Sequence, residues 1–173
     1  NDWLKYAEIK NNYMTVFSGA ILFGTLSFIK DNKQIGEIAT YYLTNVIIFD
    51  ALAFLIILIS FLPQTKKQWF WTLKEKKEND NVLYYGDIYK YDVKDYLALT
   101  YKTFGREAIN YNDIKKIEID YANQIIINAQ ISKRKYAYFR VAFYFTISAL
   151  VTPVIGIPLY FIFDPNSNEE RIV

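Results

Sequence analysis

The sequence predicts an all-α integral membrane protein, and three observations support this fold class. The apolar residues gather in three long runs, and most of the basic residues lie between the second and third runs. A helical apolar period also leads without interruption into the third run. The mean hydropathy of +0.02 is typical of a soluble chain, but it averages over strongly segregated blocks.

The three apolar runs are long enough to cross a bilayer. Residues 13–29 and 141–163 carry no charge, and residues 41–62 carry only Asp50. A hydrocarbon core of about 30 Å is crossed by roughly 20 helical residues. A soluble helical protein would have too little polar surface to cover three such runs. A signal peptide is disfavoured because a mixed polar segment precedes the first run and no small-residue cleavage pattern follows it.

The basic residues predict the orientation. Fifteen of the 20 Lys and Arg residues lie between the second and third spans. The positive-inside rule therefore places residues 64–140 and the N-terminus in the cytoplasm. We expect three parts: an N-terminal helix and transmembrane hairpin (1–63), a small, basic, helical cytoplasmic module (64–140), and a third span with a short outer tail (141–173).

Local signals predict the helices of the module and the residues at its edges. Asp92 is a candidate N-cap for a helix with Val93, Tyr96, Leu97 and Tyr101 on one face. From Asn112 onward the apolar period predicts one long helix that is cytoplasmic in its first half and continues as the third span. Trp69 and Trp71 are expected at the headgroup interface, where aromatic and basic side chains are favoured.

The composition excludes several classes of chemistry. Without His or Cys, the chain lacks the usual ligands of zinc, iron–sulfur and haem centres, the imidazole base and any disulfide. Glu118 and Asp120 lie on different faces of a helix, and no other catalytic constellation is visible. We expect no enzymatic activity, metal or cofactor. We also expect no nucleic-acid partner, because residues 64–140 hold 15 basic against 10 acidic residues, only +5.

Asp50 is the sharpest candidate for function in the membrane. A charged residue near the middle of a span costs about 2.5–3.5 kcal/mol, so it usually faces a bundle interior, a water path or a partner. Two interpretations of Asp50 are equally good: it lines an ion path, or it is a protonated acid that forms a hydrogen bond to a neighbouring helix. Asn45 is a second pore candidate, although it lies about 140° from Asp50 around an ideal helix.

Small residues in the first span predict close helix packing, either inside the hairpin, which we favour slightly, or between copies of the chain. They are Ser18, Gly19, Ala20 and Gly24.

A basic and aromatic cluster precedes the third span. Its members are Lys133, Arg134, Lys135, Tyr136 and Arg140. Charge pairing and stacking suit an anionic nucleotide. The favoured reading is an anchor that contacts lipid phosphates.

Several segments resemble the membrane effector domain of the Pycsar antiphage systems. They are AEIKNNYMTVFSGAILF from residue 7, with its acidic-x-Lys entry to the first span, YYGDIYKYDVKDYLAL from residue 84, and DYANQIIINAQISKRKYAYFRVAFYF from residue 120. The positions that match the family pattern are Ala7, Glu8, Lys10, Tyr85, Gly86, Asp87, Gln124, Ile125, Lys135 and Tyr136. Asn11 and Asn12 depart from it, because small residues are expected there.

The resemblance implies a bacterial defence effector in the inner membrane. A companion cyclase would make a diffusible nucleotide signal, and the effector would oligomerise and permeabilise or depolarise the membrane. Because the chain contains no recognisable ligand domain, either its cytoplasmic helices bind the cyclic nucleotide or another polypeptide does. A non-enzymatic membrane scaffold whose cytoplasmic helices recruit a partner is the alternative function.

Overall fold

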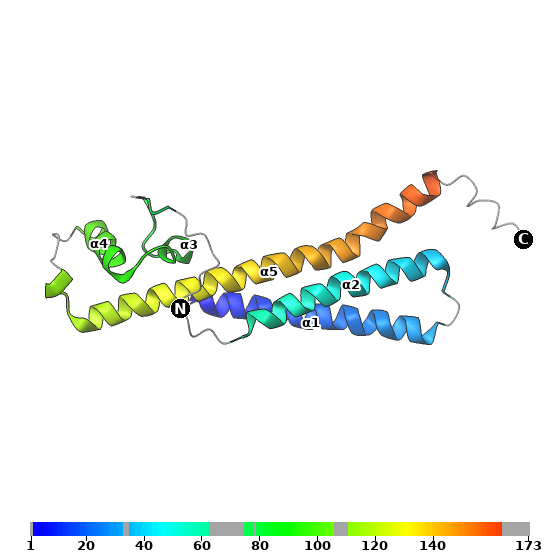
Figure 1. Ribbon diagram of the computed structural model, residues 1–173, viewed down its shortest axis with the longest axis horizontal. Coiled ribbons are helices and arrows are strands. Elements are labelled where there is room, and N and C mark those ends of the chain that lie inside the picture. Colours follow the sequence, from blue (N-terminus) through cyan, green and yellow to red (C-terminus); the bar gives the residue numbers. More distant parts are fainter. Residues whose placement is uncertain (1, 33–34, 63–74, 78, 106–110, 164–173) are drawn as a thin grey trace, which may run out of the picture. The chain divides into compact units, whose positions relative to one another are not determined.

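The computed structural model describes residues 2–32, 35–62, 75–77, 79–105 and 111–163. These residues form helices and no strand, as Figure 1 shows. The helices are α1 (Asp2–Asp31), α2 (Glu37–Ser60), α3 (Tyr85–Ile88), α4 (Val93–Thr103), the 3-10 turn η1 (Tyr111–Asp113) and α5 (Lys116–Phe163). The all-α fold class is confirmed for this part of the chain.

Three helices are long and apolar enough to cross a membrane, and each overlaps one of the predicted spans. These are α1, α2 and α5, the last with 48 residues. The long C-terminal helix is present, but it begins at Lys116 rather than at Asn112, which lies in η1. The predicted interfacial tryptophans Trp69 and Trp71 lie outside the described residues, and so does the tail after residue 163.

The chain divides into two compact units, and α1 and α5 contribute to both. The first unit comprises Asn1–Lys10 and Leu62–Ala137, and the second comprises Asn11–Phe61 and Tyr138–Val173.

The core of the first unit is rich in tyrosine. Asp92 caps α4 by accepting a hydrogen bond from the Asp95 backbone at 2.9 Å, which confirms the predicted N-cap. The apolar face of α4 then packs against α5. The buried phenols find acceptors, as buried tyrosines usually do: Tyr96 donates to the Val82 carbonyl at 3.0 Å and Tyr101 to Glu118 at 2.7 Å. The core residues are Val82, Ile88, Tyr89, Tyr91, Tyr96, Leu97, Tyr101, Ala122, Ile126 and Ala129.

The second unit is a three-helix bundle with a narrow seam of small and polar side chains. The buried positions of α2 alternate by four and three residues, which is the spacing of helices packed at a shallow angle. They are Val46, Asp50, Ala53, Ile57 and Ser60. Ala142 of α5 is also fully buried. Small residues let backbones approach closely in a bilayer, where packing replaces the hydrophobic effect between helices.

The outer faces of the same helices carry large apolar residues. Examples are Val16, Phe23, Ile48, Leu55 and Val154. This distribution, polar and small inside with large and apolar outside, suits a bundle surrounded by lipid tails.

Overpacking the seam is expected to loosen the bundle. Ala53→Leu inserts a larger side chain at a position with no exposed area and should lower the free energy of unfolding by about 1–3 kcal/mol. Loss of helical circular dichroism during titration with sodium dodecyl sulfate measures this change. Leu55→Ala is the matched control, because Leu55 is 56% exposed. Equal destabilisation by the two substitutions would contradict the packing described above.

Candidate functional site

A layer of three polar side chains crosses the interior of the three-helix unit. We call Ser18, Asp50 and Thr146 the polar layer; each is at most 1% exposed. The Thr146 hydroxyl of α5 donates to the Asp50 carboxyl oxygen Oδ1 at 3.0 Å. The Ser18 hydroxyl of α1 donates to the Asp50 backbone carbonyl at 3.2 Å. Asp50 of α2 therefore receives hydrogen bonds from both neighbouring helices.

A second polar contact joins α1 and α2. The Asn11 amide donates to the Ser60 hydroxyl at 2.9 Å, and both side chains are buried. From Asn11 to Ser18 along α1, the partner on α2 moves back from Ser60 to Asp50, so the two helices run antiparallel. An apolar cluster of Met14, Ala53, Ile57 and Ala142 is buried in the same unit. Sequence reasoning missed this contact and noted Asn11 only as a departure from the family pattern.

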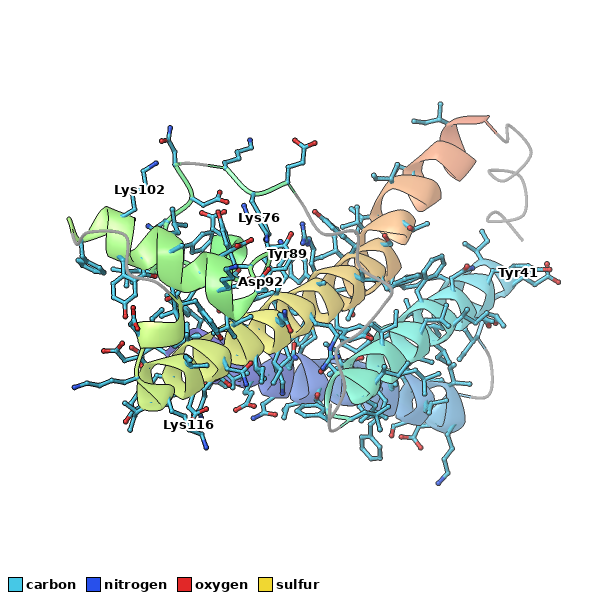
Figure 2. All side chains as sticks on the ribbon, turned by 60° about the vertical axis from the view of Figure 1, so that its left-hand side comes forward. Tyr41, Lys76, Tyr89, Asp92, Lys102 and Lys116 are labelled. Carbon is cyan, nitrogen blue, oxygen red and sulfur yellow. The ribbon has the colours of Figure 1, made fainter. Side chains whose placement is uncertain are left out.

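The structure does not bring Asn45 to Asp50. The Asn45 side chain is exposed and donates to the carbonyl of Tyr41, one turn earlier in α2, at 2.8 Å. Figure 2 labels Tyr41 near the start of this helix. The angular offset between positions 45 and 50 explains the separation, because one side of α2 faces the bundle and the other faces outward.

The small residues of the first span face two directions. Ser18 is in the polar layer, and a Cβ on Gly19 would meet the Phe54 ring at an ordinary contact distance of 3.7 Å. Ala20 and Gly24 are exposed, and a Cβ on Gly24 would meet nothing within 4 Å. Ser18 and Gly19 therefore pack inside the hairpin, whereas Ala20 and Gly24 leave a flat outer surface on α1.

In the first unit, three distant segments meet in a group that we call the aromatic–ionic cluster. Lys135 pairs with Glu8 at 3.2 Å, between Nζ and Oε1. Tyr136 stacks on Tyr85 with ring centroids 5.2 Å apart, and Lys10 Nζ lies 5.3 Å from the Tyr136 centroid. Cations above ring faces and offset rings are both favourable arrangements. The cluster comprises Trp3, Glu8, Lys10, Tyr85, Lys135 and Tyr136.

The predicted basic cluster is divided among different partners. Lys135 is engaged with Glu8, whereas Lys133 lies over the ring of Tyr89, which Figure 2 labels, at 5.2 Å. Arg134 is buried in the first unit, and Arg140 is exposed in the second. Consecutive residues of a helix point about 100° apart, so adjacent cations in sequence do not converge. Lys133 and Lys135 therefore contact different partners within the first unit.

A buried ion-pair network lies beside α3. Lys90 Nζ is 2.8 Å from Asp80 and 3.2 Å from Asp87, and the Lys90 and Asp80 side chains are almost fully buried. Burial alone would raise the pKa of Asp80, but hydrogen bonds from Lys90, the Lys77 backbone and the Tyr91 phenol outweigh it and lower the pKa to about 2. Burial and the Asp80 carboxylate raise the pKa of Tyr91 to about 12.

Gly86 lies next to this network, and the ring of Tyr84 packs over it. A Cβ there would clash with the Tyr84 ring, which packs edge-on against Tyr85 with centroids 4.9 Å apart. A larger residue at position 86 would therefore displace an aromatic pair at the aromatic–ionic cluster. The Asp87 carboxylate accepts a hydrogen bond from the Asn81 backbone N–H at 3.2 Å, in addition to its contact with Lys90.

The comparison with known families decides the family. Residues 1–162 match the family described as the Pycsar effector protein domain. The chain belongs to the Pycsar effector domain family. The resemblance found in the sequence is thereby confirmed. Comparisons with curated proteins and with solved structures found no match.

As a Pycsar effector domain, the chain is a membrane protein of antiphage defence in a cyclase-based signalling system. Most positions of the pattern noted in the sequence meet in the first unit. Glu8, Lys10 and the Lys135–Tyr136 pair lie in the aromatic–ionic cluster, and Asp87 joins the Lys90 network. Gln124 is exposed on α5. The pattern thus combines residues that are distant in sequence but paired in the fold.

The Lys90 network predicts an acid-sensitive first unit. Because the folded state holds the Asp80 pKa at about 2, below the ordinary 3.8, its stabilisation is complete above about pH 4 and is lost as the pH falls towards 2. The difference corresponds to roughly 2 kcal/mol. Thermal melts followed by tyrosine near-ultraviolet circular dichroism should show this loss.

Asp80→Asn should lower stability near neutral pH and flatten the pH dependence in that window. Asp120→Asn, which changes an exposed carboxylate of the same unit, should keep the wild-type slope. An unchanged slope in Asp80→Asn would refute the assignment.

Proposed function

We propose that this Pycsar effector responds to a nucleotide signal, or to the sensor of that signal, by oligomerising and permeabilising or depolarising the bacterial inner membrane. A companion cyclase acts on it through the diffusible signal. The chain itself works without an enzymatic reaction and without a metal or other cofactor. The observation that carries the proposal is family membership over residues 1–162.

The bundle geometry supports the need for several copies. Three helices enclose no continuous aqueous lumen, and the interior of the unit is filled by Ala53, Ile57 and Ala142. A path for ions therefore requires a rearranged bundle or an assembly of bundles. An acid such as Asp50 is costly inside a membrane, and intramembrane acids commonly mark ion or proton paths.

The outer surface of α1 supports self-association. Ala20 and Gly24 are one turn apart, exposed, and follow the small-xxx-small spacing that lets helices approach closely in lipid. We assign this surface to contact with a second copy. The basic content of residues 64–140 supports a cytoplasmic position for that region and for the N-terminus.

The nucleotide signal could act on this chain in two ways. Either the helices of the first unit bind the cyclic nucleotide, or a separate sensor binds it and contacts them. The engagement of Lys133 with Tyr89 and of Lys135 with Glu8 favours a separate sensor.

A membrane scaffold is the second candidate function, and one observation favours it. Ile117 and Tyr121 lie one turn apart on α5 in the first unit and are 59% and 64% exposed. Such a surface suits a protein partner. Toxicity of the protein expressed alone, without any partner gene, would argue against the scaffold.

Membrane potential distinguishes the two functions. Cells that express the chain together with an active companion cyclase should lose the signal of a voltage-sensitive dye, and cells without the cyclase should keep it. Asp50→Asn should reduce this loss by about tenfold or more, because the variant has no ionisable group in the interior. Asn45→Ala, a polar change on the exposed side of the same helix, is the matched control and should behave as wild type. A normal potential beside a fully active cyclase would exclude the depolarising function.

Blocking the outer surface of α1 tests self-association. Gly24→Leu fills the open space above the helix and should weaken association in detergent or lipid by about tenfold, a loss near 1.4 kcal/mol. Crosslinking of the membrane-embedded chain, followed by size analysis, measures the effect. Phe23→Leu, at a 76% exposed neighbouring position, should leave association unchanged. Unchanged association in Gly24→Leu would place the contact elsewhere.

A further inference from the structure

Asp50 has one carboxyl oxygen without a partner. Thr146 donates to Oδ1, but Oδ2 is buried and accepts no hydrogen bond from any described residue. The residue has no exposed area. A buried acceptor with no donor is costly, and a buried charge is more costly still. The packed unit therefore contains an unsatisfied position that a small ligand would complete.

Among the residues of the second unit that the structure describes, no cation is placed to neutralise a carboxylate at this position. Residues 11–29 of α1 and 141–163 of α5 carry no charged residue, and Asp50 is the one charge between residues 38 and 60. The charged groups that the structure describes at the ends of the unit are exposed: Lys30, Asp31, Glu37 and Arg140. The described tyrosines Tyr13, Tyr41 and Tyr144 are each more than 60% exposed and so point away from the seam, and Tyr42 and Tyr138 are half-buried.

We propose that Asp50 is a proton-binding site whose neutral form holds the three helices of the second unit together. A protonated carboxyl carries no charge, keeps Oδ1 as the acceptor for Thr146, and turns Oδ2 into a donor. Ser18 is the polar group that α1 contributes to this layer, and its oxygen retains lone pairs that can accept. The neutral acid thus matches the layer in both charge and hydrogen bonding.

When the Asp50 carboxyl releases its proton to water, its charge and hydrogen bonding no longer fit the polar layer. The carboxylate would be left in a seam of Ala53, Ala142 and other apolar groups without a counter-ion. Because a buried, unpaired charge is strongly disfavoured, the ionised form requires water to enter and the helices to separate. Proton binding at Asp50 therefore favours the closed unit, and proton loss favours an open, hydrated one.

A single cysteine reports this opening. The chain contains no Cys, so Ala142→Cys introduces one thiol at a fully buried seam position. The purified full chain is placed in phosphatidylethanolamine and phosphatidylglycerol vesicles and is labelled with a water-soluble methanethiosulfonate between about pH 5 and pH 9. Each rate is divided by the rate for the same chain in sodium dodecyl sulfate at that pH, which removes the titration of the thiol itself.

We expect the normalised rate to rise with pH by up to about tenfold per unit, because opening is linked to release of one proton. Asp50→Asn, a neutral side chain that keeps an acceptor for Thr146, should give a slow rate without pH dependence. Asn45→Ala, on the outer side of α2, should keep the wild-type profile. Ala53→Cys, also fully buried, replaces the reporter if Ala142→Cys does not fold.

A rate that does not change with pH in the Asp50 chain would overturn the proposal, and so would an unchanged profile in Asp50→Asn. A rate that follows sodium concentration at constant pH would assign a metal cation to the position instead and would equally overturn it. The measurement uses no cyclase, nucleotide or membrane potential. Its failure is therefore distinguishable from failure of the proposed depolarising function.

Discussion

A polar side chain inside a bilayer has to find its hydrogen-bond partners within the protein, and this constraint organises the three-helix unit around Asp50. Thr146 of α5 satisfies one carboxyl oxygen, and Ser18 of α1 bonds the carbonyl of the same residue. One position of α2 is thus joined to both other helices. Water cannot compete for these bonds in hydrocarbon, so their geometry restrains how the helices can rotate about their axes.

The other residues of the seam are consistent with this contact of the three helices at Asp50. Close approach of three backbones requires small neighbours, and Ala53 and Ala142 are fully buried beside the polar layer. The Asn11–Ser60 bond adds a second fixed point between α1 and α2. Large apolar residues are left for the outside, where lipid tails accept them.

The first unit uses a different set of interactions. Its core includes Tyr91, Tyr96 and Tyr101, whose hydroxyl groups reach acceptors, and the Lys90–Asp80 pair is also buried. Such a pair stabilises a fold only when its charges are well compensated, and here Asp87 and Tyr91 complete the network. This member of the Pycsar effector domain family thus contains a charged and aromatic unit and an apolar bundle with a buried acid, and α1 and α5 contribute to both units.

Much of this architecture follows from the sequence because it depends on local patterns. Long apolar runs predict the membrane helices, Asp92 as an N-cap predicts the start of α4, and the cost of an intramembrane acid predicts that Asp50 faces inward. The resemblance also identified residues that the fold pairs, such as Glu8 and Lys135.

The partners of these residues were not predictable in the same way. Thr146 lies 96 residues from Asp50, and no periodicity indicates which hydroxyl of α5 faces it. The ion pair of Lys90 with Asp80 likewise depends on the path of an irregular segment. The partners of the basic run 133–135 were equally hidden, because Lys133 lies over Tyr89 and Lys135 pairs with Glu8, residues that are distant in sequence.

A double-mutant cycle between Asp50 and Thr146 tests most directly the hydrogen bond that joins α2 to α5. The cycle compares Asp50→Ala, Thr146→Val and the double variant by unfolding in sodium dodecyl sulfate, with Asn45→Ala and Thr146→Val as the reference pair. If the two side chains bond as described, their effects are non-additive by roughly 0.5–1.5 kcal/mol, the range for hydrogen bonds between membrane helices. Additive effects for Asp50 and Thr146, equal to those of the reference pair, would contradict the account.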